Sequence, residues 1–385
     1  MIYLDHSATT PVRPEVLAFI HDTMEQHFGN PSSLYDLGIA TEKIIKESRR
    51  TLAKSLRVKE DEFYFTSCGS ESNNTVLRGV AEAYRKRGNH LICSAVEHPS
   101  VLRTMEYLEK EQGFELTKIG LDRKGNFDLE GLKKAMRKDT ILCSVMMVNN
   151  EVGALFPLKE IAEIVHSVNP DCVFHVDGVQ GYGRIPIDLK KTGIDAFSLS
   201  GHKLGAPKGI GGLYVRDGLR VFPLIYGGGQ EKGLRAGTEN FAYIGALALA
   251  AKLSLENREA KNEHLAKVKQ TLIEELKAQN IAFEVNGDAE KGAAHIVNFR
   301  FDGVKSEVLL HFLEGQKIYV SQGSACHNNT KSSSETLEAM GLSAEERDGS
   351  LRFSFGDETK IEDMKTVALA VKNGVDMIRT MRGKR

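Results

Sequence analysis

The sequence predicts an α/β protein that has a large domain with a mostly parallel sheet flanked by helices and a smaller α+β domain at its C-terminal end. The chain has 385 residues, more than one small hydrophobic core usually holds, so two domains are expected. Short apolar runs alternate with amphipathic helical runs from about residue 40 to residue 255. Beyond residue 255 the pattern changes to a long charged helix followed by short strands.

The predicted strands of the large domain are short and apolar, and helical segments separate most of them. Parallel neighbours need a long crossover connection, usually a helix, so this spacing favours a mostly parallel sheet with helices on both faces. The strands are expected at 62–67, 90–96, 140–148, 172–177, 195–200 and 211–216.

The smaller domain is expected to begin with a long charged amphipathic helix over 253–279. Its remaining elements are three short strands and a closing helix. We expect them at 294–301, 318–326, 350–356 and 361–381.

The composition argues against several classes of partner. Lys and Arg number 51 and Asp and Glu number 52, so neither a nucleic acid nor a membrane surface is expected to be the main partner. No apolar run approaches the ~20 residues that a membrane span needs. The N-terminus shows no secretion signal, so a cytoplasmic location is the default expectation.

The five cysteines are widely spaced and form no CxxC pair, so neither a metal site nor a disulfide framework is expected. Four of them lie in or beside apolar strand-like segments, which is typical of small core residues. Cys326 differs, because it lies in a polar stretch rich in Gly, Ser and Asn that reads as a loop. The other four are Cys68, Cys93, Cys143 and Cys172.

Polar side chains follow the predicted strands, where ligands bind in open α/β sheets. Lys203 is the most informative of them. A lysine after a strand is usually a solvated charge, and the stretch SLSGHKLGAPKG lacks the pattern of a Walker phosphate loop. It could also be a nucleophile that holds a cofactor. The full set is Ser70, His98, Asn150, Asp177, Gln180, His202 and Lys203.

The residues around Lys203 favour the nucleophile. Asp177 ends an apolar strand, where its carboxylate could hold a protonated pyridine nitrogen or simply cap the next helix. Ser70 lies at a predicted helix start, which suits a phosphate group or a plain N-cap. His98 could stack on an aromatic ring and move protons, or be structural. Together these groups match the needs of pyridoxal phosphate.

Short motifs in order along nearly the whole chain resemble those of the cysteine desulfurases of the NifS/IscS type, in the class-V aminotransferase family. The resemblance implies the aminotransferase-like pyridoxal-phosphate fold of type I. The motifs are YLDHSATTP (3–11), FGNPSSL (28–34), FTSCGSES (65–72), EHPSVL (97–102), NNEVG (149–153), HVDGVQ (175–180), SGHKLGAPKG (200–209), GGGQEKGLRAGTEN (227–240), GSAC (323–326) and LRFSFG (351–356).

The resemblance also implies a role for each matching residue. Lys203 would form the Schiff base with pyridoxal 5'-phosphate, Asp177 would pair with the pyridine nitrogen, and Gln180 would bond the phenolic oxygen. His98 would stack on the ring. Cys326 would be the nucleophile, and the substrate carboxylate would bind Asn150 and Arg352. The phosphate would be bound at Gly69, Ser70, Ser200 and His202, and by Thr238 of the partner subunit.

The implied reaction converts L-cysteine to L-alanine and leaves a persulfide on Cys326. The sulfur would pass to an iron–sulfur scaffold protein or another acceptor, and the enzyme would be an obligate homodimer. A selenocysteine lyase, or another lyase or aminotransferase on the same fold, is the alternative enzyme. A regulatory or assembly subunit that keeps the fold is the alternative without activity.

The resemblance also places the domains. We expect a large pyridoxal-phosphate-binding domain over 15–256 and a small domain over 257–385 that includes residues 1–14. The small domain would carry the loop of the catalytic cysteine at about 321–336. Gly178, Gly201 and Gly205 stand where the family commonly has larger residues, and such glycines would loosen the cofactor pocket.

Overall fold

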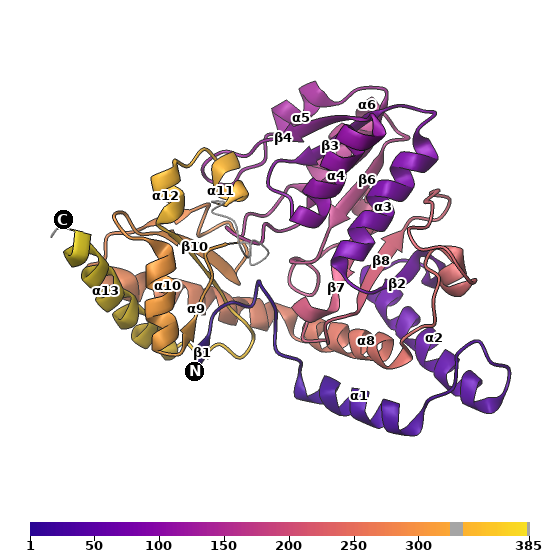
Figure 1. Cartoon of the computed structure of the whole chain (residues 1–385), viewed down its shortest axis with the longest axis horizontal. Helices are drawn as coiled ribbons and strands as arrows, with labels where there is room; N and C mark the ends of the chain where they lie inside the picture. The colour runs from indigo at the N-terminus through magenta and orange to yellow at the C-terminus, as the bar shows by residue number, and fades with distance from the viewer. Residues whose placement is uncertain (324–333, 383–385) are drawn as a thin grey trace.

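A computed structural model describes residues 1–323 and 334–382 of the chain. Its large domain is built on a seven-stranded sheet with the strand order β2-β8-β7-β6-β5-β3-β4 (Figure 1). Only β8 runs against its neighbours, so the predicted mostly parallel α/β sheet is confirmed. The strands are β2 (Phe63–Thr66), β3 (His90–Ser94), β4 (Glu115–Ile119), β5 (Thr140–Met146), β6 (Val173–Asp177), β7 (Ala196–Ser200) and β8 (Gly211–Val215).

The prediction missed β4, which lies at the edge of this sheet. Its residues Glu115, Thr117 and Lys118 are polar and exposed or half-buried, so no apolar run marks it. Charged side chains are common on edge strands because they hinder pairing with another chain.

Alternating residues of the strands pack into two separate hydrophobic clusters, one on each face of the sheet. In β3, Leu91 and Cys93 pack in the cluster formed with α3 (Gly69–Tyr84) and α4 (Pro99–Gln112). Ile92 belongs instead to the cluster that contains residues of α2 (Asp36–Leu56), α6 (Leu158–Val168) and α8 (Phe241–Leu255). This alternation, which follows from the two-residue repeat of a strand, covers both faces of the sheet with helices.

The helices α1, α2, α5, α6, α7 and α8 complete the large domain, with short 3-10 turns η1 to η3. They are α1 (Pro14–Gln26), α2 (Asp36–Leu56), α5 (Leu129–Ala135), α6 (Leu158–Val168), α7 (Leu189–Thr192) and α8 (Phe241–Leu255). The turns are η1 (Glu60–Glu62), η2 (Gly201–Lys203) and η3 (Gln230–Gly233).

The second part of the chain forms a three-stranded antiparallel sheet with helices against it. Its strand order is β12-β10-β9, and the short strand β1 pairs with β11. Leu4 packs into the hydrophobic cluster of this part, so the N-terminal segment joins it before crossing to α1 (Figure 1). The elements are β1 (Ile2–Tyr3), α9 (Arg258–Ala278), β9 (Glu284–Asn286), β10 (Ile296–Arg300), α10 (Ser306–Gly315), β11 (Ile318–Tyr319), α11 (Glu335–Ala339), α12 (Ala344–Asp348), β12 (Ser350–Ser354) and α13 (Asp363–Arg382).

The expected single helix over 253–279 is wrong. The helix α8 ends at Leu255, and α9 begins at Arg258. Asn257 between them has a φ of 53°, in the left-handed region that asparagine tolerates better than most residues. The charged helical pattern continues across this break, which is why the sequence does not reveal it.

No helix in the described part of the chain has both the length and the apolar composition needed to cross a bilayer.

Candidate active site

The carboxyl ends of the strands β2, β3, β5, β6 and β7 surround one pocket of about 210 Å³. Arg352 of β12 and the N-terminal segment close its other side. Most of the predicted site residues line this pocket: Gly69, Ser70, His98, Asn150, Asp177, Gln180, Ser200, His202, Lys203 and Arg352.

Lys203 ends the 3-10 turn η2, which follows directly after β7. Its Nζ donates to the backbone oxygens of Ser7 and Ala8, the second at 2.9 Å. Gln180 Nε2 donates to the same Ser7 oxygen at 2.9 Å. The N-terminal segment is therefore part of the site, although the sequence predicted no site residue there.

Asp177 is buried at the end of β6. Its Oδ2 accepts from Asn73 Nδ2 at 2.8 Å, and its Oδ1 accepts from the Val179 backbone N–H at 3.0 Å. Asn73 was not predicted as a site residue. It lies one helical turn after Ser70 in the motif SESNN, so the periodicity of the helix could have pointed to it.

His98 is the N-cap of α4, and its side chain accepts from the backbone N–H of Ser100. Burial lowers the pKa of His98; the charge of Asp177 raises it, and that of Lys203 lowers it further. The ring is therefore neutral near pH 7.

Ser70 lies at the start of α3, where backbone N–H groups and the helix dipole favour an anion. Ser200 and His202 reach the same pocket from the end of β7 and from η2. His202 Nδ1 lies 3.1 Å from Thr9 Oγ1. Burial, with help from Lys203 and Lys208, lowers the pKa of His202 to about 4, so this ring is also neutral and can offer one N–H donor.

Arg352 is the largest fully buried side chain of the protein's described part. Its Nη2 donates to Asp5 Oδ1 at 2.7 Å, and its Nη1 donates to the Asn150 backbone oxygen at 2.9 Å. Its Nε is buried and has no hydrogen-bond partner among the described residues. The guanidinium therefore keeps one donor for a further acceptor.

Two predicted residues are not among those that line the pocket. Thr238 is exposed in the segment that leads into α8. Cys326, the predicted nucleophile, lies outside the described residues.

Gly178 and Gly201 do not loosen the pocket, contrary to the expectation. A Cβ on Gly178 would lie only 1.8 Å from Cζ of Phe197, so the phenyl ring fills the space that a side chain would need. A Cβ on Gly201 would lie 2.8 Å from Ile210 Cγ2. Both glycines are sites of close packing.

Comparisons with known proteins agree with this geometry. The family model described as aminotransferase class-V matches residues 2–367. The chain is 42% identical to the cysteine desulfurase IscS of Methanosarcina thermophila, over 99% of this chain and 93% of that one. It is 40% identical to the cysteine desulfurase IscS of Dictyoglomus turgidum, over 99% and 96%. A solved NifS-like protein superposes with a TM-score of 0.89 at 33% identity, over 100% of both chains.

The chain therefore belongs to the class-V aminotransferase family. Within that family it groups with the cysteine desulfurases of the IscS and NifS-like kind. The predicted fold and family are both confirmed, and nothing in these comparisons favours the lyase alternative.

Proposed function

We propose that this protein is a pyridoxal-phosphate-dependent cysteine desulfurase, which converts L-cysteine to L-alanine and holds the sulfur as a persulfide on Cys326. The observation that supports this proposal is the set of residues that line the pocket. Residues from five strand ends, from β12 and from the N-terminal segment converge on it, and their chemistry is that of a cofactor site. The names of the relatives agree with the same reaction.

The residues present fit pyridoxal phosphate. Asp177 is a buried carboxylate whose two described donors, an amide and a backbone N–H, are uncharged, so a protonated pyridine nitrogen would complete its environment. Ser70, Ser200 and His202 offer donors for a phosphate group. A Cβ on Gly69 would lie 2.7 Å from Val179 Cγ2 and 3.4 Å from Ser200 Cβ, so only glycine fits between these pocket residues at the start of α3.

Bound pyridoxal phosphate supplies an electron-withdrawing group that makes the α-proton of an attached amino acid acidic. Lys203 would hold the cofactor at rest and then take the α-proton on Nζ. The backbone oxygens of Ser7 and Ala8 orient that amine. Arg352 has a planar guanidinium whose Nε donates to no described residue. Together with Asn150 it would bind the carboxylate of the substrate.

Cys326 would attack the substrate sulfur as a thiolate. A sulfur–sulfur bond forms while the bond between carbon and sulfur breaks, and the carbon takes up a proton to become the methyl group of alanine. Cysteine and one enzyme thiol thus give alanine and one enzyme persulfide, with no external oxidant. The sulfur would then pass to an acceptor such as an iron–sulfur scaffold protein.

A cytoplasmic location is part of this proposal. Cys68, Cys93, Cys143 and Cys172 are all free thiols in the described part of the chain. Free thiols are typical of compartments that keep cysteine reduced.

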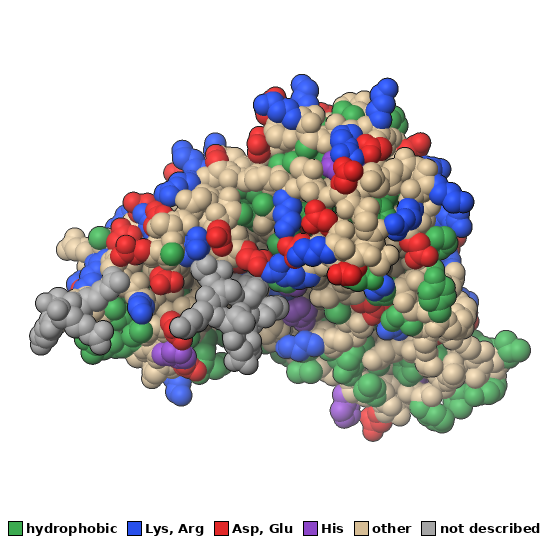
Figure 2. All heavy atoms as spheres, turned by 45° about the horizontal axis from the view of Figure 1, so that its top comes forward, with side chains coloured by type: hydrophobic (Ala, Val, Ile, Leu, Met, Phe, Trp, Pro, Cys, Tyr) green, Lys and Arg blue, Asp and Glu red, His purple; other side chains and the backbone are tan. Residues whose placement is uncertain are grey.

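A homodimer is also part of the proposal. Large apolar side chains are exposed together on α1, at the start of α2 and on the segment between them (Figure 2). Phe28 and Leu34 are 78% and 94% exposed. The exposed Thr238 lies in the segment that leads into α8, and α8 packs against both α1 and α2. This agrees with Thr238 completing the phosphate site of a partner subunit.

The first experiment is to measure sulfide and alanine released from L-cysteine in the presence of a thiol reductant. We expect the cofactor-loaded wild type to release both in equal amounts. The variant Cys326→Ala should retain the yellow cofactor colour and lose sulfide release by at least a hundredfold, because no thiol takes the sulfur.

The matched control is Cys68→Ala, which removes a different thiol, one that lines the pocket. This variant should keep sulfide release within a fewfold of the wild type. A wild type that is yellow but releases no sulfide would contradict the desulfurase activity while leaving the cofactor assignment in place.

A further inference from the structure

A chain of hydrogen bonds connects Asp177 with His98. Asn73 Nδ2 donates to Asp177 Oδ2 at 2.8 Å and to Ser100 Oγ at 2.9 Å. Ser100 Oγ in turn lies 2.8 Å from His98 Nδ1. Asn73 is 1% exposed, so its bond to Asp177 is shielded from solvent, whereas the bonds at Ser100 are half-buried.

The direction of each bond follows from the chemistry of the groups. An ionised carboxylate only accepts hydrogen bonds, so the amide nitrogen of Asn73 must face Asp177. The second hydrogen on the same nitrogen is then directed to Ser100 Oγ. Because Ser100 Oγ already accepts this bond, its own hydrogen is available for His98 Nδ1.

A second donor acts on the same ring atom. The backbone N–H of Ser100 donates to His98 Nδ1 at 3.1 Å, as an N-cap side chain accepts at the start of a helix. A ring nitrogen that accepts hydrogen bonds carries no proton. In a neutral imidazole the proton is then on Nε2.

We propose that Asn73 is a positioning residue that acts through Ser100 to hold His98 as the Nε2–H tautomer, so that the ring offers the pocket a hydrogen-bond donor and not a proton acceptor. The lowered pKa of His98 agrees with a neutral ring. The hydrogen bonds that select this tautomer all come from the protein, so the proposed tautomer does not depend on which substrate binds. Its use in desulfuration rests on the proposed function: Nε2–H would bond an ionised sulfur, and Lys203 would be the base.

The test is NMR of the purified protein labelled with ¹⁵N-histidine, because the protonated and unprotonated ring nitrogens have well-separated ¹⁵N shifts. The signal of His98 is assigned by its loss in His98→Gln. We expect an unprotonated Nδ1 and a protonated Nε2 at neutral pH. The charged groups that act on this ring are Asp177 and Lys203, and both remain in the variants used next.

The variants Asn73→Ala and Ser100→Ala should each favour the charged ring, because both weaken donation to Nδ1. One hydrogen bond contributes about 1 kcal/mol, which corresponds to a roughly fivefold larger ratio of protonated to neutral His98 at a fixed pH. Ser100→Ala keeps the backbone N–H and serves as the second variant if Asn73→Ala does not fold.

The matched control is Asn74→Ala. Asn74 is the next residue on α3; its amide nitrogen donates to the backbone oxygens of Ser70 and Ser100 at 3.0 and 3.4 Å, and its Oδ1 accepts from Thr104 Oγ1 at 3.0 Å. This variant should leave the His98 signals unchanged. A protonated Nδ1 in the wild type overturns the proposal, as does an equal response of all three variants or no response to Asn73→Ala and Ser100→Ala. The NMR experiment measures no turnover. Its outcome therefore does not depend on whether the separate assay detects desulfurase activity.

Discussion

At the scale of single residues, Arg352 is held by contacts of the fold and is also the residue proposed to bind the substrate carboxylate. It is fully buried, and two of its three nitrogens donate hydrogen bonds, one to Asp5 and one to the Asn150 backbone oxygen. A buried charge needs such partners, because an unpaired one would be costly. The guanidinium is thereby fixed in orientation before any substrate arrives.

We predict that Arg352→Lys raises KM for L-cysteine by about 10- to 100-fold, since the compact ammonium of lysine lacks the planar guanidinium fork that reaches Asp5, the Asn150 oxygen and a substrate carboxylate in fixed directions. Steady-state kinetics would measure this. Arg300→Lys is the matched control: Arg300 is another mostly buried arginine of the same sheet, and it is not among the pocket residues. An unchanged KM in Arg352→Lys would remove Arg352 from the substrate site.

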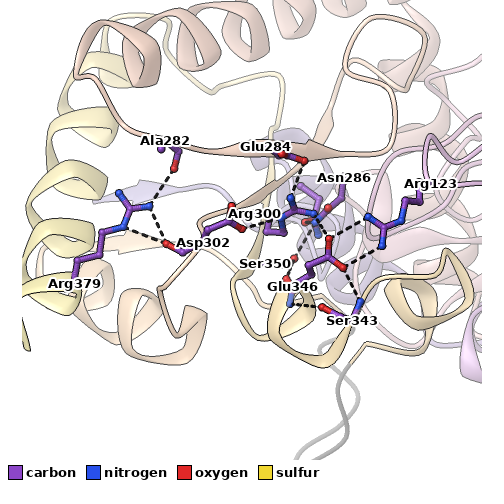
Figure 3. Close-up of polar contacts among 11 residues, drawn as sticks. Arg123, Ala282, Glu284, Asn286, Arg300, Asp302, Ser343, Glu346, Ser350 and Arg379 are labelled. Atoms are coloured by element: carbon purple, nitrogen blue, oxygen red, sulfur yellow. Dashed lines mark hydrogen bonds and ion pairs between the residues drawn. The ribbon is translucent and has the colours of Figure 1, made fainter. Parts of the chain in front are cut away.

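At the scale of elements, Glu346 joins the short helix α12 to two other segments (Figure 3). Its carboxylate accepts from Arg300 of β10 at 2.7 Å and from both terminal nitrogens of Arg123 at 3.1 and 3.2 Å. It also caps α12 through the backbone N–H of Ser343 at 2.7 Å. Arg123 lies between β4 and α5, so this carboxylate connects the two parts of the molecule.

We predict that Glu346→Gln lowers the free energy of unfolding by about 1–2 kcal/mol at pH 7, because charge-assisted hydrogen bonds are lost. The Ser343 backbone N–H bond, followed by Arg123, lowers the pKa of Glu346 to about 2, below the usual 4.5. The stabilisation is thus complete above about pH 4.5 and is lost as the pH falls toward 2.

Denaturant unfolding of both proteins between pH 7 and pH 2.5 would measure this difference. The two stabilities should converge at the acidic end. Glu338→Gln is the control, since Glu338 is 61% exposed and its Arg347 partner is 3.9 Å away. A difference between wild type and Glu346→Gln that stays constant with pH would contradict an ionic origin.

At the scale of the whole molecule, the exposed apolar surface of α1 and α2 argues for a dimer. We predict that Leu34→Asp, alone or with Phe28→Asp, converts the proposed dimer to a monomer and reduces desulfurase activity strongly, because a charge would be buried at the proposed interface. Sedimentation velocity would measure the mass. Leu369→Asp, at a 51% exposed leucine on α13, should remain dimeric and active. Variants of Leu34 and Phe28 that stay dimeric would place the interface elsewhere.

The sequence by itself determined the fold class, the family and most of the pocket. Asp177, His98 and Lys203 could be predicted because each follows an apolar strand, and parallel strands bring their carboxyl ends to one edge. The edge strand β4 could not be predicted, because no apolar run marks it. The break at Asn257 could not be predicted either, because the charged helical pattern continues across it.

Only the tertiary structure decided which distant groups meet at the site. The oxygens of Ser7 and Ala8 reach Lys203 from almost two hundred positions away, because β1 pairs with β11 and brings the N-terminal segment across the pocket. The hydrogen bond between Asn73 and Asp177 likewise forms because α3 packs against the sheet. Backbone carbonyls and amide contacts of this kind depend on the path of the chain in space, which residue types alone do not specify.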